Sequence, residues 1–206
     1  AIIKKKTLIE YTFNEIKKTK LKKESYVLTD SKKIKKISKK YNINTDYFRP
    51  PEVSTDKSSS IETIYHFTEW FLKKNNFDAM ILLQPTSPLR NYIDINKSID
   101  IFKKKKFDSL FSISESLEHP YETINLKKGK KKIFYKIKKR EKIFRRQDFD
   151  INSHFINGAI YIFKKELILK KKIFSENNHG FYLMPKIRSI DVNDLEDIEI
   201  VKNILK

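Results

Sequence analysis

The sequence predicts an α/β fold in which a mainly parallel sheet is covered by helices on both faces. Segments with the patterns of strands and helices alternate up to residue 114, which is typical of βα units. Residues 79–83 form a fully apolar run, as expected for a strand that is buried on both faces of a parallel sheet. With 206 residues and no visible repeat or linker, the chain is expected to form one domain, 1–206.

Five helices are predicted from apolar residues at helical spacing. They cover residues 7–18, 34–41, 61–72, 94–105 and 195–205. Residues 29–31 are predicted to cap the second helix, and the serines at 58–60 precede the third. Hydroxyl and carboxylate side chains suit these places because they accept hydrogen bonds from the free N–H groups of a helix start.

Strands are predicted in short apolar runs between these helices. They lie at 26–28, at 46–48 before two prolines, at 79–83, at 108–114 and at 158–163. After residue 114 the βα alternation stops. Residues 122–126 and 132–137 flank a lysine-rich turn around Gly129 and are predicted to form a hairpin.

The composition is strongly basic. Lys plus Arg number 45 and Asp plus Glu number 26, which gives a formal net charge of +19. This excess is compatible with a solvated lysine-rich surface, and also with an anionic partner such as a nucleotide, an acidic sugar or a nucleic acid. The lysines are spread over many segments, and the two dense runs lack interleaved aromatic residues, so no specific nucleic-acid surface is predicted.

Several function classes are excluded by what the sequence lacks. It contains no cysteine, which excludes disulfides, thiolate catalysis and cysteine-bound metals. Its 4 histidines have no metal-ligand spacing, and its 3 glycines form no glycine-rich phosphate loop. The first six residues are too short and too charged for a signal peptide, and no apolar run reaches the length of a membrane span. We therefore expect a soluble cytoplasmic protein that does not attach to membranes.

One polar segment directly follows the apolar run at 79–83. Gln84, Thr86, Ser87 and Arg90 bring an amide, two hydroxyls and a guanidinium into a loop of seven residues that also holds two prolines. In open α/β sheets, ligands bind beyond the carboxyl ends of the strands. The segment is therefore predicted to contact a ligand, although a polar turn with a helix cap would show the same residues.

Two further polar segments are expected at the same edge of the sheet. Arg49 precedes a rigid Pro-Pro pair and the serines 58–60, a pattern that suits an anionic ligand but also an ordinary capped helix. Asp191 follows a short predicted strand and is a candidate ligand for Mg²⁺, which prefers oxygen atoms. The neighbouring Asp194, Glu196 and Asp197 are explained by the helix dipole alone.

Residues 82–90, Leu-Leu-Gln-Pro-Thr-Ser-Pro-Leu-Arg, resemble the hallmark segment of the acylneuraminate cytidylyltransferases, the CMP-N-acetylneuraminic acid synthetases. The resemblance continues in the same order along nearly the whole chain. It includes residues 8–12, 29–30, 48–50, 56–60, 119–120, 145–148, 155–162 and 184–191. It implies a three-layer α/β/α, Rossmann-like nucleotidyltransferase fold. It also implies that the anomeric hydroxyl of a nine-carbon acidic sugar attacks the α-phosphorus of CTP and releases pyrophosphate.

The resemblance also assigns roles to single residues. It implies that Asp191, Gln84 and Arg146 are catalytic, and that Asp191 and Asn193 hold Mg²⁺. The residues implied to contact the nucleotide are Asp30, Arg49, Ser58 and Ser60, and those implied to contact the sugar are Gln84, Thr86, Ser87, Arg146, Asn157 and Tyr161. Arg90 is expected to brace the loop instead. Residues 115–143 correspond to the segment with which family members build a subunit contact, so a homodimer is expected.

The sequence departs from the family pattern in two places. Asn193 stands where the family has a second aspartate, and an amide brings no charge, so weaker Mg²⁺ binding is expected. The family's opening strand and its phosphate-binding loop, of the type Ala-Arg-Gly-Gly-Ser-Lys, have no counterpart, so the chain is expected to be truncated at its N-terminus. Three alternatives stay open: a cytidylyltransferase for pseudaminic acid, legionaminic acid or the eight-carbon acid Kdo, an inactive fragment, and a basic nucleic-acid-binding module.

Overall fold

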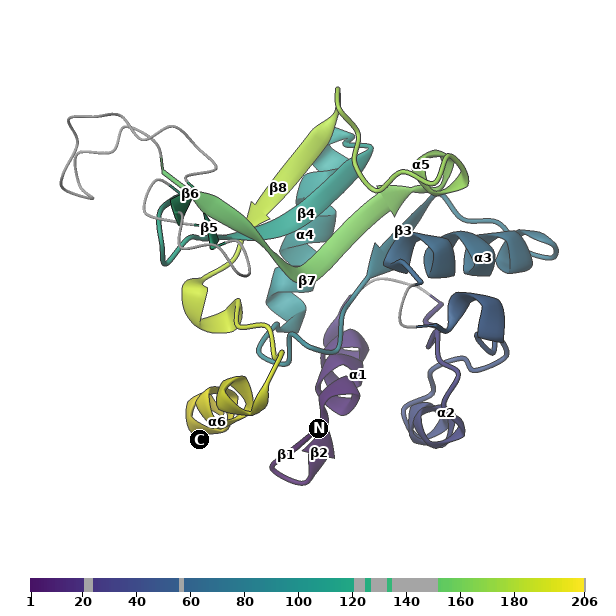
Figure 1. Cartoon of the computed structure of the whole chain (residues 1–206). Coiled ribbons are helices and arrows are strands. Elements are labelled where there is room, and N and C mark those ends of the chain that lie inside the picture. The colour runs from purple at the N-terminus through teal and green to yellow at the C-terminus, as the bar shows by residue number, and fades with distance from the viewer. Residues whose placement is uncertain (21–23, 56–57, 121–124, 127–132, 135–151, 206) are drawn as a thin grey trace.

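The computed structural model describes residues 1–20, 24–55, 58–120, 125–126, 133–134 and 152–205 (Figure 1). Its central sheet has the order β3 (Ala79–Leu82), β7 (His154–Lys164), β4 (Ser109–Glu115) and β8 (His179–Leu183). β4 and β8 are parallel, whereas β7 lies between β3 and β4 and is antiparallel to both. Three of these four described strands thus run in one direction, and the prediction of a mainly parallel sheet is confirmed.

Helices cover both faces of this sheet, as Figure 1 shows. On one face α4 (Tyr92–Lys105) inserts Ile95 and Ile99 against Leu110, Ile160 and the other buried residues of the largest apolar cluster. On the opposite face α3 (Ser60–Leu72) and α5 (Lys165–Leu169) contribute to a second cluster around Phe111 and Phe163. The three-layer α/β/α arrangement expected from the sequence is therefore present.

The N-terminal part of the chain packs beside this sandwich. A short hairpin of β1 (Ile2–Ile3) and β2 (Lys6–Thr7) leads into α1 (Leu8–Lys18), which packs with α2 (Lys32–Lys40) around Phe13, Val27 and Ile43. The C-terminal helix α6 (Leu195–Ile204) returns to this region, where Val201 and Ile3 share a cluster with Leu89. Both termini therefore lie near the loop that follows β3 (Figure 1).

The predicted helices are confirmed to within a few residues at their ends, but two predicted strands are not. Residues 26–28 form only an isolated parallel bridge between Tyr26 and Asn44, and residues 46–48 are extended without pairing in a sheet. Both segments are buried by an aromatic cluster in which Tyr26 and Tyr47 contact Phe67. Tyr26, Leu28 and Tyr47 thus pack against α3, whereas Val27 packs against α1 and α2, which explains these apolar residues without a ladder.

Some elements were not predicted from the sequence. β8 and α5 are short, and β8 holds Gly180, whose missing side chain leaves room for Phe107, since a Cβ atom there would come within 2.2 Å of that ring. Two short 3₁₀ helices, η1 (Pro51–Val53) and η4 (Lys186–Arg188), follow proline residues.

The segment after β4 contains the predicted hairpin. β5 (Asn125–Leu126) pairs antiparallel with β6 (Ile133–Phe134), with Asn125 opposite Phe134. Most of the proposed insertion 115–143 lies outside the described residues. In the part of the chain that the structure describes, no helix is long and apolar enough to cross a membrane.

Candidate active site

Two of the predicted polar segments, the loop after β3 and the segment with Asp191, meet at one edge of the sheet. Leu82 pairs with Tyr161, so the loop that begins at Gln84 lies beside the first half of β7. The backbone N–H of Val192 donates a hydrogen bond of 2.8 Å to the carbonyl oxygen of Thr86, which attaches the Asp191 segment to the same loop. The structure thereby brings together residues that are far apart in the sequence.

Gln84 lies directly against the backbone of β7. Gly158 has a φ of +74°, and a Cβ atom there would lie 2.8 Å from Gln84 Oε1 and 3.9 Å from the Tyr161 hydroxyl oxygen. A glycine is therefore required both by the backbone conformation and by the amide that rests on it. Gln84, Gly158 and Tyr161 form one small polar surface.

Asp191 is close to this surface. Burial raises the pKa of Tyr161, and the nearby Asp191 carboxylate raises it further, so the phenol is protonated at neutral pH. The Oδ1 atom of Asp191 is buried and has no hydrogen-bond partner among the residues that the structure describes. A buried carboxylate oxygen without a partner is costly, which favours a bound cation or donor at this point.

A cleft of about 830 Å³ extends from this surface along β3 towards α1 and α3. Gln84, Asp30, Arg49 and Ser60 all line it, together with apolar side chains of the surrounding helices. Arg49 Nη2 donates to Asp30 Oδ1 at 3.0 Å, and the Nε of Arg49 is buried without a partner among the residues that the structure describes. β3 is an edge strand of the described sheet, so its free edge faces this cleft. Three of the four residues predicted to contact the nucleotide therefore share a cleft with Gln84.

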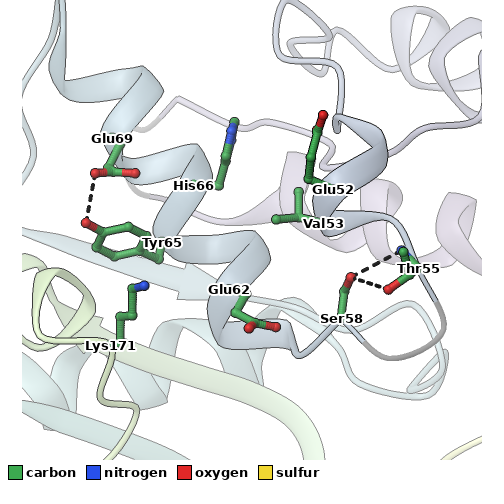
Figure 2. Close-up of a pocket in the computed structure, with 9 residues that line it drawn as sticks. All are labelled: Glu52, Val53, Thr55, Ser58, Glu62, Tyr65, His66, Glu69 and Lys171. Carbon is green, nitrogen blue, oxygen red and sulfur yellow. Dashed lines mark hydrogen bonds between the residues drawn. The ribbon is translucent and has the colours of Figure 1, made fainter.

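Ser58 is the exception. It lines a separate cavity of about 460 Å³, together with Glu62, His66, Lys171 and other residues shown in Figure 2. Its hydroxyl oxygen accepts a hydrogen bond of 3.1 Å from the N–H of Thr55 and lies 2.8 Å from the Thr55 hydroxyl. The structure thus gives Ser58 a local role in the loop before α3 and does not place it with the other predicted nucleotide contacts.

The sequence profile of the cytidylyltransferases matches residues 1–199. The chain belongs to the cytidylyltransferase family. Among the relatives, it is 28% identical over 204 residues to the post-translational flagellin modification protein B of Campylobacter coli, covering 97% of this chain and 84% of that protein. It is 26% identical over 206 residues to the CMP-N,N'-diacetyllegionaminic acid synthase of Legionella pneumophila, covering 98% and 86% of the two chains.

An N-acylneuraminate cytidylyltransferase of Streptococcus agalactiae serotype III is 32% identical over 176 residues, which are 85% of this chain. The match spans only 41% of the streptococcal protein. Among solved structures, a CMP:2-keto-3-deoxy-manno-octonic acid synthetase complexed with CTP superimposes with a TM-score of 0.69 at 12% identity, covering 100% of this chain and 90% of that one. At this identity the superposition shows a shared fold.

The cytidylyltransferase chain buries Asn157, which the family resemblance places at the sugar. Asn157 is 2% exposed; its Oδ1 accepts from the Ser112 hydroxyl at 2.6 Å and its Nδ2 donates to the Ser189 hydroxyl at 2.9 Å. Its side chain thereby connects β4, β7 and the segment that leads to Asp191. A sugar contact by Asn157 stays a prediction, while its bracing of the Asp191 segment is a finding.

The other predicted sugar residues have different surroundings. Thr86 is partly buried, whereas Ser87 is fully buried and its hydroxyl has no partner in the described part of the chain. Arg146 lies outside the described residues. Asn193 is exposed, and its Nδ2 donates to the carbonyl oxygen of Asp191 at 3.2 Å.

Sequence reasoning missed a buried ion pair next to this site. Asp94, which is fully buried, accepts from Arg188 Nε at 2.9 Å and Nη2 at 2.8 Å, and from the Tyr182 hydroxyl at 2.9 Å. The hydrogen bond to Asp94 raises the pKa of Arg188, while burial and then the Asp94 charge raise the pKa of Tyr182. In the sequence, residue 94 is only the first residue of the predicted helix 94–105, so no local pattern indicates this pair.

Proposed function

We propose that the chain carries the catalytic chemistry of a cytidylyltransferase that couples CMP from CTP to a nine-carbon acidic sugar. The sugar's anomeric oxygen forms a bond to the α-phosphorus while the bond from that phosphorus to the leaving pyrophosphate breaks. The hydroxyl proton is released as the new bond forms. One observation carries this proposal: Gln84 lines a cleft together with Asp30, Arg49 and Ser60, and Tyr161, with Asp191 near it, lies beside Gln84.

The residues divide this work by their chemistry. Arg49 offers a fixed positive charge and its unpartnered Nε to the nucleotide end of the cleft, and the apolar lining suits a base. Gln84 and Tyr161 offer hydrogen-bonding groups to the sugar end. Holding both substrates in line lowers the barrier, since orientation supplies a large part of the catalysis of such transfers.

The residues also fit a magnesium ion that is shared with the substrate. Mg²⁺ is usually held by one or two carboxylates together with phosphates and water, and it neutralises charge on the phosphates when bound. Asp191 supplies one carboxylate with a free buried oxygen, whereas Asn193 adds no charge. Within the described ranges no group of three or more acidic or histidine side chains could hold a metal alone.

We expect N193D to lower the Mg²⁺ concentration needed for half-maximal activity, and D191N to abolish that activity.

The names of the relatives support the substrate class. The two relatives of which this chain covers 84% and 86% are named for flagellin modification and for a diacetyllegionaminic acid synthase. Sialic, legionaminic and pseudaminic acids are therefore the substrates to compare first, with eight-carbon Kdo as the alternative. Use of CTP fits a cytoplasmic location.

A thermal-shift screen with CTP, Mg²⁺ and this panel of acids tests the proposal. A ligand at 100 times its Kd stabilises a protein by about 2.7 kcal/mol, which raises the melting temperature by several degrees. We expect stabilisation by CTP, a further shift with one nine-carbon acid, and pyrophosphate release with the same acid. A chain that gains no stability from CTP and forms no CMP-sugar would contradict the proposal.

We also infer that the protein is a homodimer that uses the region after β4. An apolar patch of exposed side chains supports this: Ile156 and Leu183 both pair with Ile113 and lie on one face of the sheet with Phe181. Ile156 is 51%, Phe181 51% and Leu183 58% exposed. Light scattering should give twice the mass of 24.7 kDa. L183K should shift the protein to monomers, and a monomeric unmodified protein at high concentration would refute the inference.

A further inference from the structure

A single buried arginine connects three parts of the active site. Arg90 is 1% exposed although it ends the polar loop after β3. Its Nη1 donates to the carbonyl oxygens of Gln84 at 3.0 Å and Ala159 at 2.8 Å, and its Nη2 donates to the hydroxyl of Thr12 at 2.7 Å. The prediction that Arg90 braces the loop is thus confirmed, and the contacts extend to β7 and α1.

The guanidinium keeps its charge in this position. Burial lowers the pKa of Arg90 to about 10, while the neighbouring carboxylates of Asp94 and Glu15 raise it. A pKa of this size leaves the group protonated at neutral pH. A buried cation costs free energy unless its donors are used. Both terminal nitrogens of Arg90 donate here, while its Nε has no partner among the described residues.

Arg90 fixes two walls of the position that the Gln84 side chain occupies. One wall is the backbone of Gln84 itself, whose carbonyl accepts from Arg90. The other wall is the backbone at Gly158, which precedes the bonded carbonyl of Ala159 and would place a Cβ atom 2.8 Å from Gln84 Oε1. Thr12 of α1 in turn orients the guanidinium.

We propose that Arg90 is the positioning residue for Gln84, and through it for the acidic sugar, and that the Thr12 hydroxyl sets its orientation. The sugar part of this proposal rests on the proposed function, whereas the effect on Gln84 does not. Replacing Arg90 removes a buried charge and endangers the fold, so T12V is the sharper change. The T12V change keeps the side-chain volume but removes the hydroxyl oxygen that accepts the hydrogen bond from Arg90 Nη2. T12S restores the hydroxyl.

Thr68 provides a matched control. It is also fully buried in a helix, but its hydroxyl donates to the carbonyl of Ile64 at 2.8 Å within α3, and it is not among the residues that line the cleft. T68V therefore makes the same chemical change away from the site.

The first measurement is independent of activity. The chain contains only two glutamines, Gln84 and Gln147, so labelling glutamine side chains with ¹⁵N gives two amide signals, and Q84A assigns them. We expect the Gln84 signal to move or broaden in T12V and to stay unchanged in T12S and T68V. An unchanged Gln84 signal in T12V, or an equal change in T68V, would overturn the proposal.

The second measurement uses kinetics. Because a displacement of about 1 Å can cost up to about 100-fold in rate, we expect T12V to lower kcat/KM for the sugar about tenfold, with the KM for CTP changed less than about twofold. In a Q84A background T12V should cause little further loss, since both changes act on one group. Additive losses would indicate a merely structural role and would also overturn the proposal. If the unmodified chain forms no CMP-sugar, the proposed function fails while the amide signal still decides the role of Arg90.

Discussion

Gly158 shows how a residue without a side chain determines the place of another. Its φ of +74° lies in the left-handed region, where residues with a Cβ atom are strained. The space that a Cβ atom would need is taken by the amide of Gln84. The position of the Gln84 side chain, a candidate catalytic group, therefore depends on the backbone conformation and the missing side chain at residue 158.

G158A should damage both stability and activity. We expect a loss of about 1–2 kcal/mol in the free energy of unfolding from the positive φ, and a larger relative loss of sugar turnover because Gln84 is displaced. Urea denaturation and steady-state kinetics measure the two effects. If G158A destabilises the chain but keeps the KM for the sugar, Gln84 does not contact the sugar.

At the scale of single residues, the sequence predicted which polar groups gather but not what surrounds them. Gln84 was identified because it follows a strand, and this rule depends only on the order of elements. Asp191 was also predicted to follow a short strand, but in the structure it follows η4. The partners of Asn157 could not be predicted in the same way. Ser112 lies 45 residues before it and Ser189 lies 32 residues after it, so only the folded sheet brings the three together.

The elements differ in how far local sequence determines them. The apolar faces of α3 and α4 repeat at helical spacing, so both were predicted. In the structure the two helices also begin with complete capping boxes at Ser59 and Asn91. The strand predicted at 26–28 was wrong because a ladder needs a neighbour, and within the described structure Tyr26 bridges only Asn44. β8 was missed because it is short and its partner strand β4 lies far away in the sequence. His179 pairs with Ser109, about 70 residues earlier, so the local sequence does not determine this pairing.

The first turn of α4 is coupled to the Asp191 segment through Asp94. D94N removes a fully buried charge that pairs with Arg188 and Tyr182. We expect a destabilisation of about 2 kcal/mol, less than for a fully buried pair because the Arg188 side chain is 31% exposed. D100N, on the exposed side of the same helix, should change the free energy of unfolding by less than about 0.5 kcal/mol. Equal effects of the two variants in urea denaturation would show that the pair is not stabilising.

The start of β8 should make stability depend on pH. His179 Nδ1 lies 2.6 Å from the Ser109 hydroxyl oxygen, its ring contacts Phe111 and Phe174, and burial lowers its pKa. The unfolded chain therefore binds a proton at His179 more readily than the folded one. Its contribution to stability is complete above the ordinary histidine pKa and is lost as the pH falls through the lowered one.

Urea denaturation at several pH values between about 7.5 and 5 tests this dependence, since free histidine titrates at about 6.5. H179Q should flatten the curve, whereas H154Q, at an exposed position of β7, should leave it unchanged. A curve that keeps its slope in H179Q would exclude His179 as the cause.

On the scale of the whole molecule, the positive charge is a property of the surface. Six of the nine residues of α2 are lysines, while its Ile34 and Ile37 pack inward. Lysines also lie on α1 and α4, so no single element collects the charge. The arrangement fits a solvated surface around a cleft for anionic substrates.

The basic surface should bind nucleic acid only at low salt. Binding through lysine–phosphate contacts weakens steeply as salt displaces it, so duplex DNA bound at about 20 mM salt should be released by about 150 mM. Fluorescence anisotropy of a labelled duplex measures this. Binding that persists at the higher salt, and competes with CTP, would favour a nucleic-acid-binding module over the enzyme.

The place of β7 in the sheet has a consequence for biosynthesis. β3 and β4 leave the ribosome early, but in the described sheet both pair with β7, where Leu82 and Phe111 both meet Tyr161. The backbone N–H and C=O groups that face β7 therefore stay unpaired in both strands until β7 has been translated. Strand pairs between residues far apart in the sequence also form slowly. During that interval the apolar run of β3 lacks its neighbour in the described sheet.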